Sequence, residues 1–350
     1  MTRRGARRAA FGVGQVAPEE GFLVCEDCGI VVPPNIAPLN FAIREDGRRF
    51  LVKIHGESGE TIEVDSRSAA IEIPPRRWRL LLESNRGREL RWEVYVQTGR
   101  DWRRFRPIVN RVAEHEIDGH LVYRLIGPVY NRWSEVAIRQ RNLATYEDSG
   151  ILDGESLGRV CVNCHSFAAN DAKRMLVGLR GKSSGNATLL VEDARATKLG
   201  TPFGYTAWHP SGRIAAYSTN KVRQFFHAAG PEVRDVVDLA SALAYLRVDT
   251  RMSKRVPGAS DEQHLATYPA WSPDGRMLYY CRAPMLWTDQ ETVPPERYAE
   301  VKYDLVRIAY DIEADRWGSP ETVLSAEQTG LSILLPRISP DGKFLLFCMC

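Results

Sequence analysis

Short runs of alternating hydrophobic and polar residues recur along most of the chain, and this period of two is typical of β-strands with one buried face. Trp92, Val94 and Val96 give one such alternation, within a stretch from residue 40 to 126 where glycine-containing turns separate the runs. Several short strands at this spacing predict a small β-sandwich.

One segment departs from this pattern. From Trp133 to Tyr146 the apolar positions lie three and four residues apart, with Arg139 and Arg141 outside the stripe. This spacing predicts an amphipathic helix. We expect its apolar face to pack within the protein, and covering one face of a cofactor is the alternative.

A third pattern is a repeat. Residues 208–217, 271–280 and 338–347 each begin with an apolar residue, continue through a turn that contains proline and glycine, and end in a strand. Proline fixes φ at the second turn position, and glycine takes a conformation that other residues resist. One hairpin per repeat unit predicts β-propeller blades. Closed propellers have at least about four blades, so we expect a fragment, or a ring that a further segment or partner completes.

Together these patterns predict a mainly β protein in four parts. They are a poorly ordered segment over residues 1–29, a β-sandwich-like domain over 30–130, a helical linker over 131–170, and propeller blades over 171–350.

Composition and charge exclude some classes of function. The 350 residues are 44% hydrophobic and 26% charged, which is ordinary for globular domains. The net charge of +3 is spread along the chain, apart from four arginines within residues 3–8, so we expect no nucleic-acid partner. No run approaches the roughly 20 apolar residues of a membrane span. The stretch after the arginines is too short and glycine-rich for a recognisable export signal.

The clearest chemical signal is Cys161-Val-Asn-Cys164-His165. Covalent haem attachment needs two thiols that reach the two vinyl groups and a histidine directly after the second thiol to bind the iron. We therefore expect one covalent haem c, with His165 as the proximal iron ligand. An accidental motif that houses a disulfide or half a zinc site is the alternative.

The second axial ligand has three candidates. A distal histidine or methionine would make a six-coordinate electron-transfer centre. His227 and His209 rank together as candidates, and Met175 ranks below them because its neighbours read as a strand core. For His209 the alternative is an ordinary turn residue, and for His227 an ordinary packed histidine.

Two further motifs are weaker evidence for a cofactor or metal site. Cys25 and Cys28 have the same spacing but no following histidine, which favours a disulfide or two free thiols over a second haem. His115 and His120 are five residues apart, so they do not share a helical face as zinc-protease ligands do.

The repeat turns resemble those of TolB-like propellers, over about residues 170 to 350. Together with residues 161–167 and the proline-rich stretch 33–41, they resemble a family of bacterial TolB-like propeller proteins with a CxxCH motif, many from Bacteroidetes. The resemblance implies an exported, haem-bearing protein of unsettled biochemical role, and it supplies no substrate. Because covalent haem attachment takes place outside the cytoplasm, we expect the protein in the periplasm or associated with the outer membrane and facing the periplasm.

The leading functional hypothesis is periplasmic electron transfer to redox partner proteins such as multihaem cytochromes, with the propeller as a docking platform. A protein-interaction module whose haem is structural or redox-sensing is the alternative. A haem oxidoreductase, which needs an open iron position, is less favoured. We identify no catalytic residues in the sequence and expect an electron carrier or binding module more than an enzyme.

Overall fold

The computed structural model describes residues 11–17, 22–25, 29–126, 136–171, 173–181, 185–193, 195–200, 202–226, 234–292 and 294–350. Of residues 11–17, 22–25, 163, 164 and 234 it describes the backbone alone. No helix within these ranges combines the length and apolar character needed to cross a membrane.

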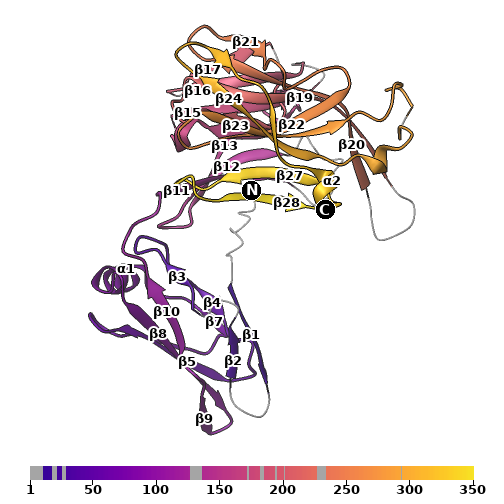
Figure 1. The fold of residues 1–350 in the computed structure, drawn as a ribbon. Coiled ribbons are helices and arrows are strands. Elements are labelled where there is room, and N and C mark those ends of the chain that lie inside the picture. Colours follow the sequence, from indigo (N-terminus) through magenta and orange to yellow (C-terminus); the bar gives the residue numbers. More distant parts are fainter. Residues whose placement is uncertain are drawn as a thin grey trace. The chain divides into compact units, whose positions relative to one another are not determined.

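The protein is mainly β, as predicted, and it divides into two compact units (Figure 1). Unit 1 comprises Met1–Tyr123 and Arg139–Ile151, and unit 2 comprises Arg124–Ile138 and Leu152–Cys350.

Unit 1 is built on a mixed sheet with strand order β3-β10-β8-β5-β6, to which β9 adds by pairing with β8. The predicted alternation is present in β8, where Trp92, Val94 and Val96 are buried. A smaller sheet has the order β2-β1-β4-β7, so strands occupy part of the N-terminal segment that we expected to be poorly ordered. The bounds are β1 Phe11–Ala17, β2 Phe22–Cys25, β3 Val31–Val32, β4 Phe41–Ala42, β5 Arg49–Gly56, β6 Ile62–Ser66, β7 Ala70–Ile71, β8 Glu89–Thr98, β9 Asp101–Arg104 and β10 Ile108–Val112.

A helix that the sequence analysis missed completes the core of unit 1. Helix α1 (Pro75–Ser84) begins with a proline at its first turn, where a missing N–H costs nothing. Its buried residues Trp78, Leu81 and Leu82 follow helical spacing, and the Trp78 ring lies 6.1 Å from that of Trp92 in β8. The helix therefore shares one core with residues of both sheets of unit 1.

The helix predicted from Trp133 to Tyr146 is wrong over its described residues. Residues 133–135 lie outside the described ranges, and Ala137–Asn142 form strand β12, between β11 (His120–Leu125) and β13 (Asp148–Asp153). Arg139 and Arg141 of β12 both pair with Asp148 of β13. Pairing with the neighbouring strands β11 and β13 decided the conformation here, against the helical spacing of the apolar residues.

Unit 2 contains the propeller blades. Three sheets follow one another, each made of sequence-consecutive antiparallel strands: β14-β15-β16-β17, β18-β19-β20-β21 and β22-β23-β24-β25, with β26 also pairing with β24. A hairpin of β27 and β28 comes next. This is the strand order of propeller blades. The first strands β14, β18, β22 and β27 lie next to one another in turn, and we call them the inner strands.

The bounds in unit 2 are β14 Cys161–Phe167, β15 Arg174–Arg180, β16 Ala187–Glu192, β17 Arg195–Leu199, β18 Thr206–Trp208, β19 Ile214–Phe226, β20 Arg234–Arg247, β21 Met252–Arg255, β22 His264–Trp271, β23 Met277–Pro284, β24 Asp304–Asp311, β25 Arg316–Trp317, β26 Glu321–Leu324, helix α2 Ala326–Thr329, β27 Ile333–Ile338 and β28 Leu345–Met349.

The tryptophans of the repeat join consecutive inner strands. The indole N–H of Trp208 donates to the carbonyl of Ser166 in β14 (3.1 Å), and that of Trp271 donates to the carbonyl of Ala207 in β18 (3.2 Å). In these two repeats the tryptophan therefore links its own inner strand to that of the preceding blade.

Candidate functional site

The CxxCH motif lies on β14, the inner strand of the first blade, and not on the predicted helical attachment segment. Cys161 is the Cα partner of Arg180 in β15, and Asn163 that of Gly178. The register then shifts before the next pair, so the strand carries one extra residue around Cys164 and His165. Such a bulge bends a strand and redirects side chains.

The bulge recurs in other inner strands at the same place. Register shifts interrupt β22 around Tyr268 and β27 around Leu335, each three residues before the end of its strand, as Cys164 is in β14. Tyr268 and Leu335 have positive φ values of 54° and 55°. Tyr205, three residues before the end of β18, places its ring 4.3 Å from that of Tyr268. The second motif cysteine thus occupies a position that the following blades give to tyrosine or leucine.

The pairing of β14 with β15 places the side chains of Cys161 and His165 on opposite faces of the sheet. Residues directly opposite in an antiparallel pair project to the same face, so Cys161 shares the face of Arg180 and Phe167 shares that of Met175. Arg180 and Met175 lie an odd number of residues apart in β15, and therefore on opposite faces. The ring of His165 meets that of Phe167 edge-on at 5.9 Å.

This geometry tests the fit of a haem. The donor set is the right one, but Cys161 and His165 lie on opposite faces of the paired strand. Cys161 is the first residue of β14, so releasing its pairing with Arg180 alone would free it to turn. The residues fit covalent haem attachment on that condition.

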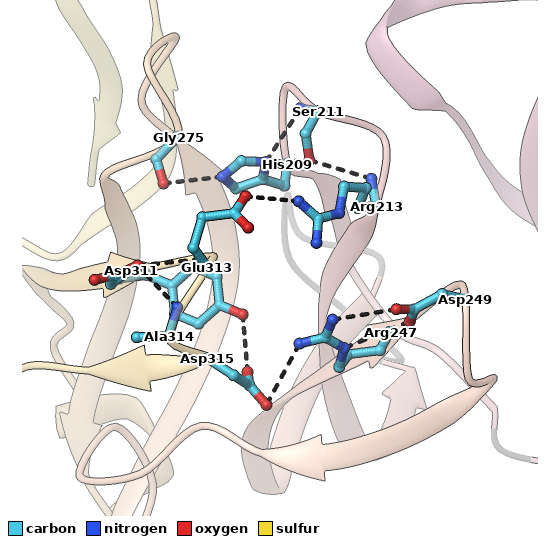
Figure 2. Close-up of polar contacts among 11 residues, drawn as sticks. His209, Ser211, Arg213, Arg247, Asp249, Gly275, Asp311, Glu313, Ala314 and Asp315 are labelled. Atoms are coloured by element: carbon cyan, nitrogen blue, oxygen red, sulfur yellow. Dashed lines mark hydrogen bonds and ion pairs between the residues drawn. The ribbon is translucent and has the colours of Figure 1, made fainter.

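Of the candidate distal ligands, His209 is fully engaged within the protein (Figure 2). Its ring is buried, with 4% of the residue exposed. Nδ1 accepts from the Ser211 amide (3.1 Å) and lies 2.8 Å from the Ser211 hydroxyl, which assigns the proton to Nε2, the donor to the Gly275 carbonyl (3.1 Å). Burial lowers the pKa of His209. Binding iron would require His209 to give up one of these bonds.

Met175 is buried in β15 and lies on the same face of the sheet as Phe167. The ring of Phe167 contacts that of His165, so Met175 and His165 share this face. His227 lies outside the described residues. Within the described ranges no group of three or more histidine, cysteine, aspartate or glutamate side chains is arranged to hold a metal ion.

Cys28 lies outside the described residues, and of Cys25 only the backbone, in β2, is described. The proposed disulfide or free thiols therefore stay predictions.

A cavity that the sequence analysis missed lies beside the β19–β20 hairpin, with a volume of about 880 Å³. Its lining includes Lys221, Arg223 and Arg255, together with Asn220 and Ser241. These residues come from three strands, and no local motif marks them.

Fold and motif together define a propeller-blade protein with a CxxCH motif on an inner strand, the last two residues of the motif lying at a bulge. No known family model matches the chain, and no curated protein matches it. Among solved structures, it is similar to the β-propeller domain of the trilobed protease from Pyrococcus furiosus, with 12% identity, a TM-score of 0.38, and coverage of 86% of this chain and 79% of that one.

It is also similar to oligogalacturonate lyase from Vibrio parahaemolyticus, with 9% identity, a TM-score of 0.37 and coverage of 66% of this chain. The chain spans 57% of the length of that lyase. Kuenenia stuttgartiensis hydrazine synthase matches with 13% identity, a TM-score of 0.36, and coverage of 96% of this chain and 99% of that one. At this level of similarity none of these proteins carries its activity over to this chain.

Proposed function

We propose that this chain is a haem c-bearing propeller protein that carries electrons in the periplasm, with the blades as a docking platform for redox partners such as multihaem cytochromes. One observation supports this best. The complete CxxCH donor set lies on β14, with Cys164 and His165 at a bulge whose position recurs in the inner strands β22 and β27.

In this proposal Cys161 and Cys164 hold the porphyrin and His165 binds the iron. The bound haem supplies one-electron redox chemistry, while the protein sets its potential and its docking. The edge of the Phe167 ring limits rotation of the His165 imidazole. The sixth ligand is His227 or Met175. His209 would serve only after releasing its bonds to Ser211 or Gly275.

A binding module whose haem is structural or redox-sensing is the second candidate. The cavity lined by Lys221, Arg223 and Arg255 favours it, because ligands commonly bind in cavities of this size that contain a few well-placed polar groups. The visible absorption spectrum of the haem iron distinguishes an electron carrier or a binding module from an oxidoreductase. A six-coordinate, cyanide-inert iron supports a carrier or module, and a ligand-binding iron supports an enzyme.

The test is expression with an export signal and a c-type maturation system, followed by acid-acetone extraction. We expect the colour to stay with the protein, because thioether bonds hold the porphyrin. Cys161→Ser and Cys164→Ser should each reduce bound haem several-fold, whereas the exposed Cys348→Ser serves as the matched control and should not. Colour that leaves with the solvent, or motif variants as red as the control, would refute the proposal.

A further inference from the structure

Asp238 of β20 carries a carboxylate that the protein only half satisfies. The Asn220 side-chain amide donates to Oδ2 at 2.9 Å. The second oxygen, Oδ1, is buried and has no hydrogen-bond partner within the described part of the chain. An unpaired buried carboxylate oxygen is costly, so such an atom in a native fold calls for a partner.

Two tyrosines, Tyr205 and Tyr268, pack against each other beside the hydrogen-bond network that holds this carboxylate. The rings of Tyr205 and Tyr268 lie 4.3 Å apart with their planes inclined by 50°. Burial, with the Asp238 charge as a further cause, raises the pKa of Tyr268 and of Tyr303. The Asn220 amide that donates to Asp238 also donates to the hydroxyl of Thr267 (3.3 Å), the residue before Tyr268. The backbone amide of Tyr205 donates to the Ser218 hydroxyl (3.2 Å) in the same network. Tyr205 is 47% exposed, so the cluster reaches solvent.

Polar neighbours fix the orientation of the carboxylate. The Ser218 hydroxyl donates to Oδ1 of Asn220 (2.6 Å), which turns the amide nitrogen of Asn220 toward Asp238 and Thr267. The free oxygen of Asp238 is thus held in place before any ligand arrives. Such preorganisation lowers the entropic cost of binding.

No described cation neutralises Asp238. Burial raises the pKa of this carboxyl, the polar side chains of Ser241 and Asn220 oppose the rise, and no lysine, arginine or histidine of the described ranges does so. The next residue after Asn220 in β19, Lys221, projects to the opposite face and pairs with Glu291 at 3.1 Å.

We propose that Asp238, Tyr205 and Tyr268 form a binding site for a primary ammonium group, with Asp238 as counter-ion and the tyrosine rings as cation–π faces. The ammonium N–H groups would satisfy the free Oδ1 and the tyrosine hydroxyls together. A hard metal ion fits less well, because calcium takes six to eight oxygen ligands and commonly several carboxylates. Either a small amine or the lysine side chain of a partner protein offers this group.

The test is calorimetric titration of the full chain with n-butylammonium and, separately, with N-acetyl-lysine amide. We expect Asp238→Asn to weaken binding at least about tenfold and Tyr205→Ala several-fold. The matched control is Asp249→Asn, which removes an exposed carboxylate that pairs with Arg247. Circular dichroism checks that each variant is folded. Asp238→Asn should stay folded, because it removes a buried charge.

The proposal also predicts linkage to protons. Since Asp238 binds the cation only when ionised, binding should tighten as pH rises and should release a proton, seen as a dependence of the heat on buffer. Binding of the lysine derivative alone assigns the site to a protein partner, and binding of both ligands assigns it to amines in general. Absent binding, equal binding to Asp238→Asn, or equal competition by potassium chloride would overturn the proposal.

Discussion

His209 joins two neighbouring repeat turns through both of its ring nitrogens. Nε2 donates to Gly275 in the turn of the next blade, and Nδ1 accepts from Ser211 in its own turn. Arg213, in the same turn as His209, adds an ion pair with Glu313 at 2.7 Å (Figure 2). The neutral imidazole satisfies this arrangement, whereas a protonated Nδ1 would face the Ser211 amide as a second donor.

We predict that His209 contributes to the free energy of unfolding in a way that depends on pH. Burial lowers the pKa of His209 below its value in the unfolded chain, so protons bind the unfolded state better. The stabilisation is therefore present above about pH 6.5 and is lost as pH falls below it. Replacing His209 by Asn should cost about 2 kcal/mol at pH 8 and less at pH 5. A difference between the two proteins that stays constant over this range in urea unfolding would contradict the prediction.

At the scale of the element, the repeat turns offer a matched pair of glycines. Gly275 and Gly342 both have φ of +72°, which disfavours any other residue. A Cβ at Gly275 would lie 2.2 Å from Nε2 of His209, whereas at Gly342 the nearest atom is 4.0 Å away.

We therefore expect Gly275→Ala to destabilise the protein by about 1–3 kcal/mol more than Gly342→Ala. The free energy of urea unfolding measures both losses. Adding His209→Ala to Gly275→Ala should recover part of the excess. If both glycine variants lose the same free energy of unfolding, the contact between the new Cβ and His209 does not destabilise the protein, and the prediction is wrong.

At the scale of the whole molecule, each unit has its own core. One cluster of buried residues runs from Val32 to Val112 in unit 1, and another from Ile214 to Tyr310 in unit 2. Separate cores of this kind can unfold separately.

We expect scanning calorimetry to show two transitions. Trp78→Ala, in helix α1, should lower the free energy of unfolding of unit 1 by about 3–5 kcal/mol. The transition of unit 1 should then move to a lower temperature, while that of unit 2 stays in place. Tyr280→Ala, in β23, should do the reverse, since both side chains are buried. If either variant shifts both transitions equally, the two units unfold as one.

The sequence by itself determined the blades and the chemistry of the motif. Turn geometry is local, since proline, glycine and a short polar side chain within five residues decide it, so Trp271 and its turn could be recognised without the fold. The order of Cys161, Cys164 and His165 is equally local. The first blade was harder to see, because residues 168–173, which join β14 to β15, lack the proline and glycine of the repeat turns.

Tertiary structure decided the rest. Residues 137–142 became a strand because Asp148 and β13 were available to pair with them, which no local spacing could reveal. The bulge that places Cys164 at the position of Tyr268 depends on the register of pairing between strands. The roles of His209 and Asp238 depend on partners from other turns and strands, Gly275 and Asn220, and these contacts exist only once the chain has folded.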